Sequence, residues 1–150
     1  PVEVAPGLFI GSVGAAMNKS ALVAAGVTHI LTVAKGLRAY YEAEFTYLVL
    51  PIGDTPFDNI YDIIPAGVDF IDEAMQSGGS ILVHCFAGKS RSTSIIAAYL
   101  MLTRLFTLEA AMQFIRAKRP QAQPNAGFCA QLKKWERYVQ YLDKTGATGE

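Results

Sequence analysis

Short runs of apolar residues alternate along this chain with longer segments in which apolar residues recur every three or four positions. The short runs are typical of β-strands and the longer segments of amphipathic helices. We expect strands over four ranges, residues 8–12, 28–34, 46–51 and 80–84. The second is rich in β-branched residues. The fourth carries the continuous apolar run that is typical of a buried central strand.

Helices are expected between and after these strands, and residues that favour helix ends indicate where they begin. One helix covers residues 18–25, and a second begins at Asn59 or Asp62 and continues to about Gln76. A third covers residues 92–104. The last two helices have polar residues at their expected N-caps: Thr107 and Asn125.

This alternation of strands and helices predicts an α/β fold, with a central mixed, mostly parallel sheet flanked by helices. A chain of 150 residues fits one domain with a single core. We expect that domain to span residues 1–143. The small and polar residues 144–150 are expected to form a flexible tail.

Charge and cysteine content narrow the classes of partner. Thirteen basic residues balance thirteen acidic ones, so no overall cationic field favours binding to nucleic acid or to a membrane surface. The longest apolar run, near residues 95–102, is too short to span a bilayer, and no secretory signal is visible. The two cysteines, Cys85 and Cys129, lack metal-ligand spacing. We therefore expect no metal, no cofactor, and a reducing intracellular location in the cytoplasm, the nucleus or both.

One segment between the fourth strand and the third helix carries a pattern for anion chemistry. It reads His84-Cys85-Phe86-Ala87-Gly88-Lys89-Ser90-Arg91-Ser92. A short loop that enters a helix N-terminus turns successive backbone N–H groups towards one point, and the helix dipole adds positive potential there. Gly88 allows the turn, and the planar fork of Arg91 matches two phosphate oxygens. The loop is therefore expected to bind phosphate through residues 86–91.

Cys85 stands at the start of this loop, where positive ends of dipoles gather. Such surroundings lower a cysteine pKa from ~8.5 into a range of about 3.5 to 7.5. A thiolate at the base of a phosphate site is placed for attack on phosphorus, which would give a phosphocysteine. We expect His84 to orient the loop and support the thiolate. The Ser92 hydroxyl is expected to donate to the sulfur when the sulfur becomes the leaving group.

The chain resembles the dual-specificity branch of the cysteine-dependent protein tyrosine phosphatases over nearly its whole length. The loop is similar to that family's pattern His-Cys-x-x-Gly-x-Ser-Arg-Ser. Further segments match the family elsewhere: Gly7 to Ser12, Gly26 to Leu31, Ala98 to Met101, Arg119-Pro120, Pro124-Asn125, Phe128 and Gln131-Leu132. The resemblance implies that residues 1–143 are a catalytic domain that hydrolyses phosphotyrosine and phosphoserine or phosphothreonine. The implied partner is a phosphorylated protein, such as a protein kinase.

The resemblance also implies an aspartate that protonates the leaving oxygen, on a loop before the long helix. Three aspartates compete: Asp54, Asp58 and Asp62. Asp54 is preferred because it follows the third strand at a distance from residues 69–72 that agrees with the family. Asp58 is second, whereas Asp62 is more simply explained as a helix cap. Asn125 resembles a family asparagine that holds the loop or its neighbours, and it is equally well explained as a cap.

Three residues keep alternatives open. Thr32 stands where the family often carries asparagine. The hydrogen bonds by which that asparagine supports the loop are therefore not assured in this chain. Lys89 places a cation in the loop, as in relatives that act on phosphoinositides or inositol phosphates, so the same chemistry on a non-protein substrate is an alternative. A catalytically silent phosphate-binding module is a third hypothesis. Cys129, in the last helix, is expected to belong to the hydrophobic core. The alternative is that it acts as a resolving thiol for oxidised Cys85.

Overall fold

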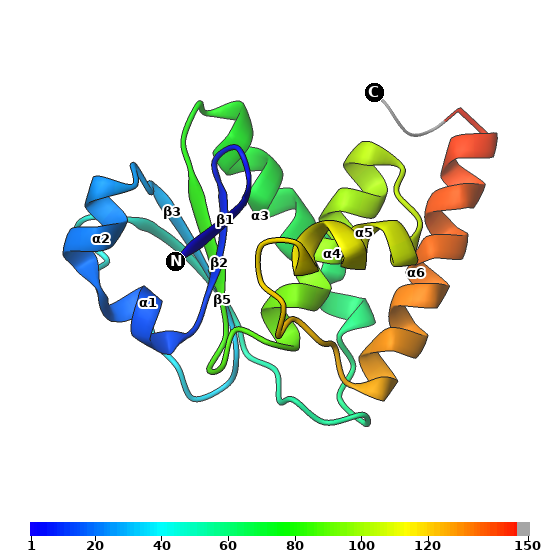
Figure 1. Ribbon diagram of the computed structural model, residues 1–150, viewed down its shortest axis with the longest axis horizontal. Helices are drawn as coiled ribbons and strands as arrows, with labels where there is room; N and C mark the ends of the chain where they lie inside the picture. The colour runs from blue at the N-terminus through cyan, green and yellow to red at the C-terminus, as the bar shows by residue number, and fades with distance from the viewer. Residues whose placement is uncertain (147–150) are drawn as a thin grey trace.

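The computed structural model describes residues 1–146, which form one five-stranded sheet with helices on both of its faces (Figure 1). The strands are β1 (Val2–Ala5), β2 (Leu8–Gly11), β3 (His29–Val33), β4 (Thr46–Leu50) and β5 (Ile81–His84). Their order across the sheet is β1-β2-β5-β3-β4, and all neighbours are parallel except β1 and β2. The predicted mixed, mostly parallel sheet is confirmed.

Among the strands of the described residues, β1 is the one that the hydrophobic pattern did not predict. It pairs antiparallel with β2 through a tight turn, in which Gly7 has a φ of +78°. The Gly7 N–H donates to Glu3 Oε2 at 3.0 Å. Four residues are too few for a period of two to stand out from chance, so this strand is set by pairing with β2 rather than by its own pattern.

Seven helical segments are found within residues 1–146. They are α1 (Val13–Met17), α2 (Lys19–Ala24), η1 (Tyr61–Ile63), α3 (Ile64–Gln76), α4 (Arg91–Arg104), α5 (Leu108–Arg116) and α6 (Ala126–Lys144). Helices α1 and α2 cover one face, α3 and α4 cover the other, and α5 and α6 pack on α4 (Figure 1). Thr107 and Asn125 cap α5 and α6 as predicted, because their side chains accept from the N–H groups of Ala110 and Phe128. Residues 147–150 of the predicted tail lie outside the described residues.

The prediction that Asp62 caps the helix ending at Gln76 is wrong. Asp62 lies inside η1, and its own N–H donates to Asn59 Oδ1 at 3.1 Å. Asn59 Nδ2 in turn donates to Asp62 Oδ2 at 3.0 Å. Helix α3 starts only at Ile64, with a proline in its first turn. A 3₁₀ turn precedes α3, and Asn59 and Asp62, the two residues predicted as caps, hydrogen-bond to each other at that turn.

Alternate residues of the central strand supply the two halves of the core. Ile81 and Val83 of β5 pack in the larger cluster with α3 to α6, whereas Leu82 packs in the smaller cluster with α1 and α2. Helix α4 is buried along most of its length, which explains its weak polar face. Among the described residues, no single helix has both the length and the composition needed to cross a membrane. Helices α4 and α5 pass that test only as a pair bent by 119°.

The parallel strands end together at one edge of the sheet. In the register of the ladder, His84 at the end of β5 lies between Gly11 of β2 and Thr32 of β3. The chain leaves β5 at this point and enters α4 after six further residues. Open parallel sheets bind ligands at the carboxyl ends of their strands. The fold therefore places the loop over 85–90 where a ligand site is expected.

Candidate functional site

The backbone of the loop between β5 and α4 is turned so that its carbonyl groups point outwards. Each carbonyl from residue 85 to residue 90 accepts a hydrogen bond from outside the loop. The donors, in the order of their acceptors, are His84 Nδ1, Val13 N, Arg119 Nη2, Arg119 Nε, Gln123 N, and finally Ser94 N with Ser94 Oγ. In a trans peptide the N–H points away from the carbonyl. The N–H groups of the loop therefore converge on its inner side, as in an anion-binding nest.

Helix α4 adds its N-terminus to this nest. No side chain caps its first turn, whereas Asn18, Thr107 and Asn125 cap α2, α5 and α6. The first residue of α4 is Arg91, a cation at the helix end where the dipole disfavours positive charge. Its Nη1 donates to Ile52 O at 2.9 Å. Its Nε is buried without a hydrogen-bond partner among the described residues. An oxyanion would satisfy both the helix end and this donor.

Cys85 lies at the base of the nest and is 2% exposed. Burial by itself would raise the pKa of the Cys85 thiol. Hydrogen bonds from the Ser92 hydroxyl and from the backbone amides of Ser92, Lys89 and Gly88 outweigh burial, so that this pKa lies below its ordinary value. The distance from Cys85 Sγ to Ser92 Oγ is 3.2 Å. The site therefore favours a thiolate, the nucleophilic form of cysteine.

His84 is fully buried and fixes the start of the loop from within the sheet. Its Nδ1 lies 3.3 Å from Cys85 O and its Nε2 lies 2.8 Å from Thr32 Oγ1. A carbonyl only accepts, so Nδ1 carries the proton, and the Thr32 hydroxyl donates to Nε2. Burial lowers the pKa of His84 to about 4, so the ring is neutral at pH 7. Thr32 thus hydrogen-bonds to the residue next to the nucleophile. The threonine that replaces the asparagine common in the family therefore still supports the loop.

Asp54 and Asn125 meet beside the phosphate loop. Asn125 Nδ2 donates to Asp54 Oδ1 at 2.9 Å, and the Asn125 N–H donates to Ser90 Oγ at 3.0 Å. The Asn125 Oδ1 accepts from the N–H of Phe128 at 2.8 Å. Both interpretations of Asn125 thus describe real contacts, because one side chain caps α6 and also contacts Asp54.

The other two candidate aspartates are engaged in their own loop. Asp58 Oδ2 accepts from Thr55 N at 2.9 Å and from Thr55 Oγ1 at 2.7 Å. The hydrogen bond from the Thr55 hydroxyl is the main cause that lowers the pKa of Asp58 below its ordinary value. Asp62 is paired with Asn59. Of the three, Asp54 is the one whose hydrogen-bond partner also hydrogen-bonds to the phosphate loop, whereas Asp58 interacts with Arg91 through charge alone.

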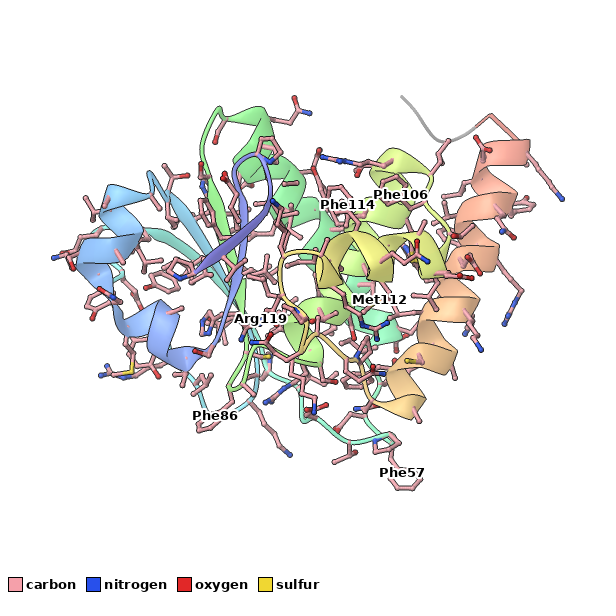
Figure 2. The ribbon with its side chains drawn as sticks, in the orientation of Figure 1. Phe57, Phe86, Phe106, Met112, Phe114 and Arg119 are labelled. Carbon is pink, nitrogen blue, oxygen red and sulfur yellow. The ribbon has the colours of Figure 1, made fainter. Side chains whose placement is uncertain are left out.

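Two side chains of the loop point away from the nest. Phe86 is 62% exposed and Lys89 is also exposed, so the backbone of these residues, not their side chains, faces the expected phosphate. Figure 2 shows Phe86 and Phe57 extending from two loops at the same end of the molecule. Cys129 is half-buried rather than in the core, and its Sγ lies 3.6 Å from Pro124 O. Both cysteines are free.

Three residues that hold the site were not predicted to do so. Arg119 binds two loop carbonyls. Gln131 Oε1 accepts from the N–H groups of Ile60 and Tyr61, and its Nε2 donates to Asp58 O. Gly127 lets α6 approach the Asp54 loop. In the sequence, Arg119 and Gln131 are noticed only as matches to a family pattern, and Gly127 is not noticed at all. The reason is that the partners of these residues lie 31 to 73 positions away along the chain. Within residues 1–146, no group of His, Cys, Asp and Glu is placed to hold a metal ion.

Comparisons with known proteins agree on one family. A family model described as dual specificity phosphatase, catalytic domain, matches residues 8–138. Dual specificity protein phosphatase 1 of Arabidopsis thaliana is 48% identical over 144 residues, which are 96% of this chain and 73% of that protein. The crystal structure of human DUSP28 has a TM-score of 0.90 at 35% identity, over 94% of this chain and 99% of that one. The human tyrosine phosphatase-like serine/threonine/tyrosine-interacting protein has a TM-score of 0.89 at 36% identity, over 93% of this chain and 97% of that one.

Proposed function

This chain belongs to the dual specificity phosphatase catalytic-domain family, and we propose that it hydrolyses phosphotyrosine and phosphoserine or phosphothreonine in proteins through a phosphocysteine on Cys85. The observation that carries this proposal is the position of the Cys85 sulfur. Backbone amides at the start of α4 and in the loop lower its pKa, and the carbonyls of that loop are all bound from outside. The loop leads into Arg91, whose Nε is buried without a partner among the described residues. This arrangement binds a phosphoryl group and presents a thiolate to its phosphorus atom.

In the first step, the Cys85 thiolate attacks phosphorus in line with the leaving oxygen. An S–P bond forms while the P–O ester bond breaks. Asp54 gives its proton to the leaving oxygen, so that the substrate side chain departs as a neutral phenol or alcohol. The loop amides and Arg91 hold the non-bridging oxygens, on which charge is concentrated in the transition state.

In the second step, water attacks the phosphocysteine. The ionised Asp54 accepts a proton from that water, a new P–O bond forms and the S–P bond breaks, releasing inorganic phosphate. The Ser92 hydroxyl, 3.2 Å from the sulfur, donates to the thiolate as it is expelled. Each group returns to its starting protonation state, so the cycle needs no cofactor.

The direct test is hydrolysis of an aryl phosphate and of phosphopeptides by the wild-type chain and by Cys85→Ser. We expect turnover by the wild type and none above background by the variant, which keeps a hydroxyl but has no thiolate. Turnover that survives in Cys85→Ser would contradict the proposal. Binding of phosphopeptide without any wild-type turnover would favour a silent binding module instead, despite the presence of both Cys85 and Arg91.

The choice of substrate is tested separately. The exposed Lys89 offers a cation beside the loop, so phosphoinositides and inositol phosphates belong in the same assay. We expect phosphopeptides to give the larger kcat/KM. A larger kcat/KM for the lipid or the inositol phosphate would keep the mechanism and change the substrate class.

Substrate trapping identifies the partner. An Asp54→Ala chain should bind its phosphorylated protein and release it slowly, because the leaving oxygen receives no proton. We propose that the captured proteins are phosphoproteins of the cytoplasm or nucleus, where reducing conditions keep the thiol of Cys85 available, and that a phosphorylated protein kinase is among them.

A further inference from the structure

Arg119 contacts the back of the phosphate loop from the connection between α5 and α6. Its Nε donates to Gly88 O at 2.6 Å and its Nη2 donates to Ala87 O at 3.0 Å. Figure 2 shows Arg119 beside the loop that joins β5 to α4. Its side chain is half-buried. None of these contacts reaches the inner side of the loop, where a phosphoryl group would bind.

The two carbonyls that Arg119 binds belong to two particular peptide groups. The carbonyl of Ala87 shares a planar amide with the N–H of Gly88, and the carbonyl of Gly88 shares one with the N–H of Lys89. These N–H groups are the two loop amides that lower the pKa of the Cys85 sulfur. Each peptide group therefore has a guanidinium at its oxygen end and the nucleophile at its hydrogen end.

We propose that Arg119 is a positioning residue for the nucleophile, which acts through these two peptide groups to stabilise the anionic sulfur of Cys85. A cation on the carbonyl oxygen polarises the amide and strengthens the hydrogen bond that its N–H donates. The fork of Arg119 also fixes the orientation of both groups, so that less reorganisation is needed when charge appears on the sulfur. This inference rests on the proposed thiolate role of Cys85.

The packing around Gly88 shows how closely the parts fit. Gly88 has a φ of +65°, and a Cβ built on it would lie 2.7 Å from Arg119 Nη2 and 2.6 Å from Gly11 O. A side chain at this position would displace the guanidinium from the carbonyls. The glycine of the loop therefore serves both the turn and the approach of Arg119.

Other charged and titratable groups around the loop are unchanged when Arg119 is replaced. They are His84 at the end of β5, Lys89 in the loop, Arg91 at the start of α4, and Asp54 and Asp58 in the segment after β4. A change in the acidity of Cys85 on substitution of Arg119 is thus attributable to the loss of its guanidinium. Arg116 provides a matched control. It donates to Ala122 O at 2.9 Å and to Gln123 Oε1 at 2.6 Å, and these contacts brace the same connection without touching a loop carbonyl.

The experiment measures the rate at which iodoacetamide alkylates Cys85 between pH 5 and pH 9, in chains that carry Cys129→Ser. We expect Arg119→Met to react about three- to tenfold more slowly than its parent at pH 6 and equally fast at pH 9, because it loses thiolate and not access. Arg116→Met should follow the parent at every pH. Circular dichroism checks that each variant is folded, and Arg119→Gln, which disturbs packing less, decides the question if Arg119→Met does not fold.

Two results would overturn the inference. One is a profile for the Arg119 variant that superimposes on the parent profile. The other is slowing by one factor at every pH, which would indicate altered access to the sulfur. An ordinary thiol profile in the parent chain would instead overturn the proposed function itself, so the two failures are distinguishable.

Discussion

Asp54 and Asp58 lie on the same loop, yet they differ in what holds them. Asp58 is bound twice by Thr55, and those bonds favour its ionised form. Asp54 is bound by Asn125, which also contacts the phosphate loop through Ser90. A proton donor must lie near the leaving oxygen, and Asp58 is instead used to shape its own turn. The contacts of the two side chains therefore favour Asp54 as the acid.

We predict that Asp54→Asn lowers kcat by about 10²- to 10⁴-fold for substrates with poor leaving groups, because general acid catalysis contributes about that much. The loss should shrink for aryl phosphates whose leaving group needs no proton. Steady-state kinetics over a series of leaving groups measures both effects. Asp58→Asn is the control and should keep the wild-type dependence on the leaving group. A larger loss in Asp58→Asn than in Asp54→Asn would assign the acid to Asp58.

At the scale of elements, the site depends on how closely α6 approaches the loop that carries Asp54. A Cβ built on Gly127, in the first turn of α6, would lie 2.0 Å from Pro56 O and 2.5 Å from Pro56 Cα. Both are backbone atoms, so a side chain there must displace the loop or the helix. Gln131, one turn further along α6, holds the same loop through Asp58 O. Helix α6 thus positions the loop of the proposed acid, Asp54, without supplying the acid itself.

Gly127→Ala should therefore impair acid catalysis while it leaves the nucleophile intact. We expect a lower kcat with a steeper dependence on the leaving group, and an unchanged pH profile for alkylation of Cys85. Gly14→Ala is a suitable control, because a Cβ at Gly14 would meet only Ser12 Oγ at an ordinary contact distance of 3.6 Å. Equal kcat values for the two variants would show that the contact with Pro56 does not position the acid.

The elements were predicted where the local pattern is strong. Strands β2 to β5 follow from apolar runs, and the starts of α5 and α6 follow from Thr107 and Asn125, whose side chains do accept from the helix ends. The short elements β1 and α1 were not predicted, since they are too short to show a period and lack the continuous apolar run that marks the equally short β2 and β5. The role given to Asp62 failed because the intervening 3₁₀ turn has no clear sequence pattern.

At the scale of the whole molecule, the centre of the sheet contains a titratable ring. His84 lies fully buried between β2 and β3, and burial lowers its pKa to about 4, compared with 6.5 for an ordinary histidine. The folded state therefore favours the neutral ring. The stability that this preference contributes is fully present above about pH 6.5 and is lost as the pH falls towards 4.

We predict that His84 contributes about 3 kcal/mol to the loss of unfolding free energy between pH 7 and pH 4, since each pKa unit corresponds to about 1.4 kcal/mol. Urea unfolding across this range measures it. His84→Gln should lower the stability at pH 7 and flatten the pH dependence, whereas carboxylates contribute equally to both chains and cancel in the difference. An unflattened pH dependence in His84→Gln would show that the ring titrates normally in the folded protein.

The part of the site that could be predicted is the part whose residues are contiguous in the chain. Residues 84–92 follow one another, so strand, loop and helix together indicate an anion site without any knowledge of distant contacts. The contacts that complete it join residues far apart, such as Asn125 with Asp54 across 71 positions and Arg119 with the loop across 31 and 32. The sequence around Arg119 does not show that this side chain binds loop carbonyls, because every arginine is able to donate hydrogen bonds. Tertiary packing alone identifies these partners.

The pH dependence of Cys85 alkylation in the Cys129→Ser chain, with and without phosphate, tests most directly whether the loop creates an anionic nucleophile inside an oxyanion site. The structure predicts that half-maximal reactivity falls at a pH below that of an ordinary thiol and that phosphate slows the reaction. Reactivity that rises only where a free cysteine ionises, together with indifference to phosphate, would contradict it.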